Sequence, residues 1–420
     1  MVLLDLMEQI NMKKIIVLAG GNDQIALIKA LRERYEGVEI VLIDFAENPV
    51  AKSFADKHLV ISTMDQDAVL RATKEENADM IIITCGDQPL PIMAYVAEQL
   101  NLPCYLTYEQ ALSLTNKQFM KDIMINNGIP TAKYFVVNRQ LNEDMVSSLS
   151  FPLIIKPADC NGSKGVRKVV DIDDLRMYTQ QAIELSRSRT AIIEEFKEGI
   201  EISVDAFVNN GKASVLMTSQ LNKHQVNDST MVIYQSVIPA QLGKTVLDKI
   251  DEIANKIARA YKLSFSPLLI QMIVNGEEVS VIEFSARIGG GAKYQTIKEY
   301  TGFNILNANI DAMVGKTSDI SFKPSKAVVS RCHLYTIGGV FDRIWGLEQL
   351  IKEGIIDSYT QTVSSGCKVL APQGSSNRIG SVLIKASSYD ELTSKIQTAI
   401  NTIKVLDSDG TDILYRRMYE

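Results

Sequence analysis

One segment of the chain places several reactive side chains in a row. In residues 279–287, VSVIEFSAR, alternate side chains of an expected strand point to opposite faces. One face is apolar, and the other offers a carboxylate, a hydroxyl and a guanidinium to a ligand. These polar residues are Glu283, Ser285 and Arg287, on the same expected face as Val281. The simpler alternative is that Glu283 and Arg287 pair with each other on an exposed surface.

Gln271 is a polar residue in the preceding apolar strand, and the hairpin loop decides which way it faces. A two-residue loop at 275–276 would turn Gln271 away from Glu283. A three-residue loop at 275–277 would place it opposite Val281 and diagonal to Glu283, at about 7–8 Å. Three-residue loops with a left-handed glycine are common. The chemical interpretation therefore predicts the longer loop, with Gln271 and Glu283 as ligands of one cation.

A second candidate is a Gly/Ser/Lys loop at residues 161–165, which follows an apolar strand that ends at Lys156. The glycines Gly162 and Gly165 permit close approach of a ligand, and successive backbone N–H groups can bind an anion. Lys156 and Lys164 add positive charge. Two interpretations stay open: a phosphate-binding loop, or a solvated hairpin tip that carries lysines.

A third candidate is the acidic linker 194–201, EEFKEGIE, between two expected strands. Its backbone can offer donors and acceptors to a purine edge, and Glu201 can accept hydrogen bonds from ribose hydroxyls. Taken alone, the linker is better explained as an acidic connector that its charge keeps solvated. The glycine turn 289–291 comes directly after Arg287, and its N–H groups could hold a carboxylate or a phosphate.

Two familiar nucleotide motifs fail. Gly-Lys-Thr occurs at 243–245 and 315–317, but a Walker A loop needs another glycine where Ile238 and Ile310 stand. Gly20-Gly21 follows the first expected strand without completing GxGxxG. That pair is either a tight turn or a backbone wall for a substrate.

Composition narrows the class of protein. The chain has 420 residues, which suggests more than one domain, and 44 basic against 50 acidic residues give a formal charge of −6. This charge does not favour a nucleic-acid binder. Five scattered cysteines without CxxC fit neither a disulfide framework nor a zinc site, so we expect a cytoplasmic location. No apolar run approaches the ~18 residues of a membrane span.

The elements that position these residues follow from periodicity. Residues 14–112 alternate buried strands with amphipathic helices, which predicts a parallel sheet whose ligand sites lie at the carboxyl ends of the strands. A helix is expected to open at Thr115, which forms a capping box with Gln118. Further helices are expected at 173–188 and 245–261, and domain borders near Thr115 and 322–324.

In this order the segments resemble the ATP-grasp superfamily of ADP-forming carboxylate–amine ligases, over nearly the whole chain. TNKQFMKDIMINNGIPTAKY resembles the helix that carries a nucleotide-binding lysine. FPLIIKPADCNGSKGV resembles the strand with a second such lysine and the loop over the phosphates. IIEEFKEGIEISVDAF resembles the adenine hinge and ribose acid, and QMIVNGEEVSVIEFSARIGGG resembles the metal hairpin with its anion-binding arginine.

The resemblance implies a role for each matched residue. The phosphates would be bound by Lys117, Lys156, Gly162, Ser163, Lys164 and Gly165, and adenosine by Glu194, Glu195, Phe196, Lys197 and Glu201. The metal would be bound by Gln271 and Glu283, and Arg287 and Lys156 would be catalytic. Many relatives have glutamate where Gln271 stands, and most have asparagine where Ser285 stands.

The resemblance also implies an α/β (α+β) ATP-grasp fold. Its parts would be a parallel-sheet domain (1–114), an opening helix and lid (115–190), a catalytic core (191–322) and a C-terminal α+β domain (323–420). YQSVIPAQL and GSSNRIGSVLIKA resemble amino-acid ligases that make dipeptides.

The implied activity joins a carboxylate, such as an amino acid, to an amine through an acyl phosphate and releases ADP. It would use ATP with one or two Mg²⁺ ions, or Mn²⁺, and small-molecule substrates rather than nucleic acid or membrane. A homodimer is the family-level expectation. The alternatives are a bicarbonate-activating enzyme like biotin carboxylase or carbamoyl-phosphate synthase, and a nucleotide-binding module without ligase activity.

Overall fold

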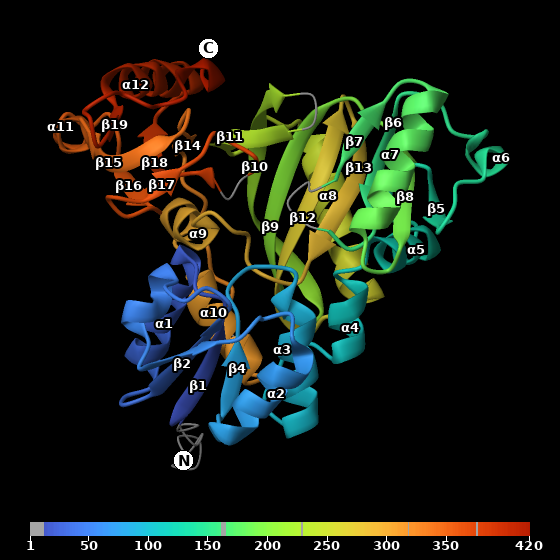
Figure 1. Ribbon diagram of the computed structural model, residues 1–420, viewed down its shortest axis with the longest axis horizontal. Coiled ribbons are helices and arrows are strands. Elements are labelled where there is room, and N and C mark those ends of the chain that lie inside the picture. Colours follow the sequence, from blue (N-terminus) through green and yellow to red (C-terminus); the bar gives the residue numbers. More distant parts are fainter. Residues whose placement is uncertain (1–11, 161–164, 228–229, 318, 375–376) are drawn as a thin grey trace.

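The computed structural model describes residues 12–160, 165–227, 230–317, 319–374 and 377–420. Figure 1 shows a blue N-terminal region below, a green lid at the upper right, a central sheet, and an orange-to-red C-terminal region at the upper left. Within the described ranges, no helix has both the length and the apolar character needed to cross a bilayer.

The N-terminal region is built on a four-stranded parallel sheet in the order β3-β2-β1-β4. Its strands are short apolar runs, and most of their side chains are buried because helices cover the sheet. The strands are β1 (Lys14–Leu18), β2 (Glu39–Asp44), β3 (Lys57–Val60) and β4 (Met80–Ile82). The helices are α1 (Asn22–Arg34), the 3-10 helix η1 (Val50–Phe54), α2 (Gln66–Glu75), α3 (Pro89–Leu100) and α4 (Tyr108–Ser113).

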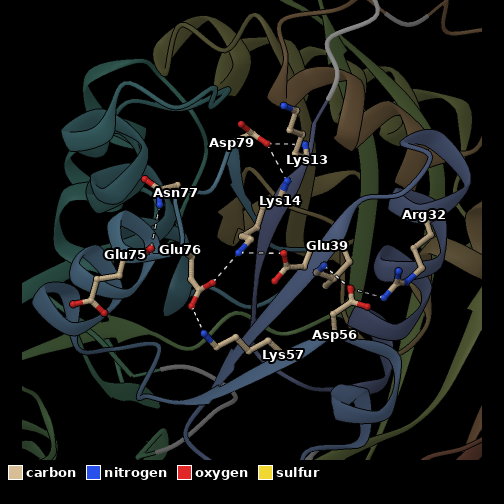
Figure 2. Close-up of polar contacts among 11 residues, drawn as sticks. Lys13, Lys14, Arg32, Glu39, Asp56, Lys57, Glu75, Glu76, Asn77 and Asp79 are labelled. Carbon is tan, nitrogen blue, oxygen red and sulfur yellow. Dashed lines mark hydrogen bonds and ion pairs between the residues drawn. The ribbon is translucent and has the colours of Figure 1, made fainter.

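Charged side chains cluster where these strands begin (Figure 2). The ammonium of Lys14 lies 3.1 Å from Glu39 and 3.0 Å from Glu76, and Glu76 also pairs with Lys57. The backbone N–H groups of Lys13 and Lys14 donate to Asp79. This edge is therefore occupied by the chain's own ion pairs, and the opposite edge, where the strands end, faces the rest of the molecule.

A second four-stranded sheet, antiparallel, has the order β5-β8-β6-β7. It lies mostly within the segment 115–190 that was predicted to contain a lid, and we call β5 to β8 the lid, although its action as a lid stays a prediction. The helix α7 packs on it through Leu175, Ala182 and Ile183. The helix α5 (Lys117–Asn126) precedes the lid, which comprises β5 (Tyr134–Asn138), α6 (Glu143–Val146), β6 (Leu153–Pro157), β7 (Arg167–Val169), α7 (Ile172–Leu185) and β8 (Thr190–Glu195).

The cap of α5 differs from the predicted one. Asn116 is the N-cap, and its side chain accepts hydrogen bonds from the N–H groups of Gln118 and Phe119. The hydroxyl of Thr115 instead donates to the carbonyl of Ala111, at the end of the preceding helix. The capping box at Thr115 was therefore wrong, because a better acceptor stands one residue later.

The central sheet has eight strands in the order β13-β12-β9-β10-β11-β14-β18-β16. One face packs on α8 (Lys244–Ala260) through residues such as Ile250 and Ile257, whereas the other packs partly on α9 (Lys293–Thr301). Figure 1 shows that α10 (Ile305–Met313), in orange, lies among the blue elements of the N-terminal region. The long strands are β9 (Ile200–Asn209), β10 (Lys212–Asn227), β11 (Thr230–Ile238), β12 (Phe265–Asn275) and β13 (Glu278–Ser285).

The C-terminal region continues this sheet, since β11 pairs with β14 and β14 with β18. The domain border at 322–323 stays a prediction, although backbone hydrogen bonds join β11, before the border, to β14, after it. A small sheet, β17-β15-β19, completes the region. Its elements are β14 (Val328–Leu334), β15 (Gly339–Trp345), α11 (Leu347–Lys352), β16 (Ser358–Gln361), β17 (Lys368–Val369), β18 (Gly380–Ala386), α12 (Tyr389–Thr402), β19 (Lys404–Asp407) and the 3-10 helix η3 (Arg416–Met418).

Candidate active site

The hairpin β12–β13 does bring Gln271 and Glu283 together, but not through the predicted loop. Asn275 pairs with Glu278, so only residues 276 and 277 form the turn, with Gly276 in the left-handed region at a φ of 58°. The three-residue loop was therefore wrong. A β-bulge then shifts the register by one residue, which places Gln271 directly opposite Glu283.

The bulge also corrects the expected strand face. Before the bulge, Val281 pairs with Met272 and is buried in the core beside α8, away from Glu283. A bulge adds one unpaired residue to one strand, so the side chains after it change face relative to the partner strand. Glu283 and Ser285 keep their shared face because both follow the bulge. This irregularity gives the row of polar side chains its final position.

A cavity lies between this hairpin, the start of α5 and the loop after β4. The buried Lys117 is the first residue of α5, and its ammonium lies 3.8 Å from Glu283 and donates to the carbonyl of Cys160 at 2.5 Å. The polar side chains that line the cavity are Asp87, Lys117, Gln271, Glu283, Ser285 and Arg287. Four predicted site residues, from segments up to 170 positions apart, therefore converge here.

Lys156 lies in a buried ion cluster next to this cavity. The carboxylate of Glu194, on β8, lies between two ammonium groups, that of Lys156 on β6 at 2.6 Å and that of Lys121 on α5 at 2.6 Å. Burial alone would raise the pKa of Glu194, but the two ammonium groups outweigh it and bring the pKa to about 2. Burial is also the main reason why the pKa of Lys121 falls to about 8.

Arg287 is already paired in this structure. Its guanidinium donates to both carboxylate oxygens of Asp87, at 2.8 and 2.7 Å. Burial alone would raise the pKa of Asp87, yet Arg287 holds it below its ordinary value. An anionic substrate that binds Arg287 would compete with this carboxylate.

The glycine turn after Arg287 does hold a carboxylate, and it belongs to the chain itself. The N–H groups of Gly291 and Ala292 donate to Asp23, near the start of α1, at 3.1 and 3.0 Å. On the N-terminal sheet, the N–H of Gly20 donates to Asp44 at 2.7 Å. The turn after Arg287 thus holds the N-terminal region against the segment that follows β13, whereas the bond from Gly20 to Asp44 lies within the N-terminal region.

Basic side chains from the C-terminal region flank the same turn. A Cβ atom on Gly291 would lie 2.5 Å from a terminal nitrogen of Arg378, so the guanidinium of Arg378 lies directly against this turn. Arg331 on β14 is buried and donates to Thr296 and Ser381, both at 3.0 Å. Burial lowers the pKa of Arg331 to about 10. Its Nη2 atom is buried without a hydrogen-bond partner among the described residues, so it offers a donor to an anion.

Comparisons with known proteins identify the fold. Residues 149–295 match the family model described as the ATP-grasp domain. The chain contains an ATP-grasp domain. A formate-dependent phosphoribosylglycinamide formyltransferase of Prochlorococcus marinus is 23% identical over 402 residues, which are 94% of this chain and 98% of that protein.

Other matches are longer proteins or solved structures. The multifunctional protein ura1 of Schizosaccharomyces pombe is 22% identical over 299 residues, which are 69% of this chain but only 13% of that protein. An L-amino acid ligase from Bacillus licheniformis has a TM-score of 0.77 at 21% identity, with 94% of this chain and 99% of that chain covered. These likenesses confirm the predicted ATP-grasp fold and its α/β class.

The predicted adenine hinge, Glu194–Lys197, spans the end of β8 and the start of the connection to β9. The Glu194 side chain points into the ion cluster, and Glu195 accepts a hydrogen bond from the N–H of Ser150. The ammonium of Lys168 lies 3.7 Å from the centre of the Phe196 ring. Further along, Glu201 on β9 pairs with Lys223 on β10 at 2.5 Å.

The turn into β9 depends on Gly199. Its φ is 135°, and a Cβ there would lie 2.3 Å from the carbonyl oxygen of Val274. Only glycine therefore lets the hinge approach β12 this closely.

The glycine loop of the ATP-grasp domain is only partly described. Gly165 lies beside Pro157 and Leu185, and its φ of 76° is in the left-handed region. The predicted phosphate ligands Gly162, Ser163 and Lys164 lie outside the described residues. Their roles stay predictions, as do the individual roles of the other site residues.

The sequence analysis missed several charged residues of the site: Lys121, Asp87, Asp23, Arg331 and Arg378. A usable signal existed for Lys121, because it follows Lys117 by four residues and so shares its helix face. Asp87 carried a weaker signal, since it follows the end of a parallel strand. The two arginines come from the last region, where nothing in the sequence pattern predicted that one would contact α9 and the other the glycine turn.

Proposed function

We propose that the chain is an ATP-dependent ligase that joins a carboxylate to an amine and releases ADP and phosphate. The observation that carries the proposal is the convergence of Lys117, Gln271, Glu283 and Arg287 on one cavity, beside the buried Lys156. These residues supply cationic donors, oxygen ligands and a guanidinium, which phosphoryl transfer to a carboxylate requires.

The charge of this region favours a polyanion. Lys117, Lys121 and Lys156 contribute three positive charges, and Glu194 and Glu283 two negative ones. A net positive charge in a largely buried cluster is stabilised when an anion binds. We assign the triphosphate to Lys117 and Lys156, and adenosine to the hinge and Glu201.

The hairpin fits a magnesium ion that arrives with the nucleotide. In the described ranges, no three or more His, Cys, Asp or Glu side chains come together as a metal site. The hairpin instead offers one carboxylate and one amide oxygen, from Glu283 and Gln271. Mg²⁺ is often held by one or two carboxylates, with phosphate and water oxygens in the remaining positions. When bound, it would neutralise charge on the phosphates.

The reaction we propose has two steps. A substrate carboxylate oxygen attacks the γ-phosphorus, and the bond to the ADP oxygen breaks, which gives an acyl phosphate. The amine nitrogen then attacks the acyl carbon, the C–O bond to phosphate breaks, and the nitrogen loses a proton. Arg287 and the unpartnered donor of Arg331 would orient the carboxylate and steady the negative charge.

A product assay tests this proposal. The purified chain with Mg²⁺ and ATP should release ADP and phosphate only when a carboxylate, such as an amino acid, and an amine are both present. Glu283→Ala should lower turnover by about 100-fold or more, because it removes the only carboxylate ligand on the hairpin. Glu278→Ala, at the exposed start of the same strand, is the matched control and should leave turnover unchanged.

Three results would contradict the proposal. AMP release would indicate adenylation of the carboxylate, and ATP hydrolysis driven by bicarbonate alone would favour a bicarbonate-activating enzyme. Nucleotide binding without turnover over a broad panel of carboxylates and amines would favour a binding module.

A further inference from the structure

The Lys121–Glu194–Lys156 cluster has two positive charges and only one negative charge. Each carboxylate oxygen of Glu194 lies 2.6 Å from one ammonium: Lys156 donates a hydrogen bond to one oxygen, and Lys121 forms an ion pair with the other. All three side chains are less than 10% exposed. One ammonium would be enough to neutralise one carboxylate. Neutralisation of Glu194 in the unliganded protein therefore does not explain why a second lysine is present.

Binding of a phosphate by Lys156 would explain the second lysine. If its ammonium leaves Glu194 for an anion, the carboxylate stays buried. A buried carboxylate that loses its only partner costs several kcal/mol, which would weaken nucleotide binding by orders of magnitude. Lys121 prevents this loss because it remains on the other oxygen of Glu194.

Lys121 is itself held in place by groups other than Glu194. Its ammonium donates to the hydroxyl of Thr131 at 2.6 Å, and that hydroxyl donates to the carbonyl of Val281 on β13 at 2.8 Å. The ring of Tyr134 lies 5.5 Å from the same ammonium. The lysine is thus fixed from α5 and from the metal hairpin, so it does not have to follow Lys156 when Lys156 moves.

We propose that Lys121 is a positioning residue for nucleotide binding, which retains the Glu194 carboxylate so that Lys156 can turn to the phosphates. The inference rests on the proposed function, since it needs a nucleotide polyphosphate next to Lys156. Lys121 itself does not touch the nucleotide. It acts through Glu194.

This role predicts that nucleotide affinity depends on pH. The charged or titratable groups that face Lys121 are Lys117 on its own helix, Tyr134, Glu194, Lys156 and Glu283. With a pKa of about 8, Lys121 loses its proton in a range that is easily measured. Neutral Lys121 cannot retain the carboxylate, so nucleotide affinity should stay level below about pH 8 and fall above it.

The test measures binding of adenylyl imidodiphosphate with Mg²⁺ by titration calorimetry. Lys121→Met should weaken binding about 10- to 100-fold, whereas Lys121→Arg should stay within about 3-fold of the natural chain. Lys14→Met is the matched control, because Lys14 is also an ion-paired lysine but lies at the far edge of the N-terminal sheet (Figure 2). It should leave the affinity unchanged.

A double variant separates this role from a merely structural one. Lys121→Met combined with Glu194→Gln has no carboxylate to retain, so it should bind the analogue better than Lys121→Met alone. Equal affinity of Lys121→Met and the natural chain, or no recovery in the double variant, would overturn the proposal.

Two further readouts complete the experiment. If Lys121→Met does not fold, the pH profile of the natural chain decides, and a level affinity across pH 8 would contradict the role of Lys121. If the natural chain binds no nucleotide at any pH, the proposed function fails and this inference fails with it. Normal binding with an unchanged Lys121→Met variant would overturn this inference alone.

Discussion

Arg287 and Asp87 form a two-point ion pair across 200 residues of sequence, with both carboxylate oxygens engaged at 2.8 and 2.7 Å. Asp87 follows the last strand of the N-terminal sheet, and Arg287 follows β13 of the central sheet. The pair therefore joins the two regions at the cavity they share. It also occupies the guanidinium that we assign to the substrate carboxylate.

Replacing Asp87 tests this connection. Asp87→Asn should lower the free energy of unfolding by about 2–4 kcal/mol, because it leaves a buried guanidinium without its counter-ion. Inorganic phosphate at constant ionic strength should stabilise the variant more than the natural chain, since the anion can take the empty place. Urea unfolding with and without phosphate measures both effects. Asp248→Asn, from an exposed pair with Lys244, should cost no more than about 1 kcal/mol; equal losses would contradict the assignment.

The proposed metal ligands on the β12–β13 hairpin give a second prediction. Gln271→Glu would place a second carboxylate opposite Glu283, so magnesium should bind more tightly. The Mg²⁺ concentration for half-maximal ADP release should fall several-fold. Asn275→Asp, exposed at the end of the same strand, adds the same charge away from the cavity. If both variants shift the magnesium dependence equally, a general charge effect explains the result and the two-ligand hairpin is wrong.

The lowered pKa of Glu194 leads us to expect that the free energy of unfolding depends on pH in the acidic range. Burial opposes its ionisation, but Lys156 and Lys121 hold its pKa at about 2, below the ordinary value of 4.5. A carboxylate with a lowered pKa in the folded state stabilises the protein fully above the ordinary pKa, and this contribution is lost as the pH falls from about 4.5 towards 2. It amounts to at most about 3 kcal/mol. In urea unfolding, the difference in free energy of unfolding between the natural chain and Glu194→Gln should become smaller as the pH falls through this range. A difference that stays constant would contradict the lowered pKa of Glu194.

Gly199 predicts a steric cost at the hinge. Gly199→Ala should destabilise the chain by about 2–4 kcal/mol, because its Cβ meets the carbonyl of Val274 and its φ of 135° is strained for alanine. Gly374→Ala has open space around it and should be close to neutral. Thermal unfolding of both variants checks this. A Gly199→Ala variant as stable as the natural chain would show that the hinge tolerates a side chain.

The sequence predicted the N-terminal strands well, because apolar runs that end in glycine or aspartate leave few other arrangements. It also placed Lys117, Gln271, Glu283 and Arg287 in one site through the order of segments. It could not predict the bulge, since one extra residue in a ladder depends on packing against α8 rather than on local pattern. The two-residue turn around Gly276 was equally consistent with the sequence.

The partners of the site residues were also beyond the sequence. Asp87, Asp23 and Lys121 meet Arg287, the glycine turn and Glu194 only after the sheets have packed against each other. Contacts over such separations depend on tertiary placement, and a single sequence gives no measure of it. The helix spacing of Lys117 and Lys121 is the exception, because four residues place both on one face.

The shared ladder of β11 and β14 limits how the molecule can open. Four residue pairs, from Gln235↔Cys332 to Ile238↔Val329, tie the C-terminal region to the central sheet by backbone hydrogen bonds. A hinged rotation of that region would have to break this ladder, whereas the described strands of the smaller lid sheet share no ladder with the central one. We therefore expect any opening and closing to occur at the lid sheet, and we expect Arg331 on β14 to keep its place relative to the central sheet.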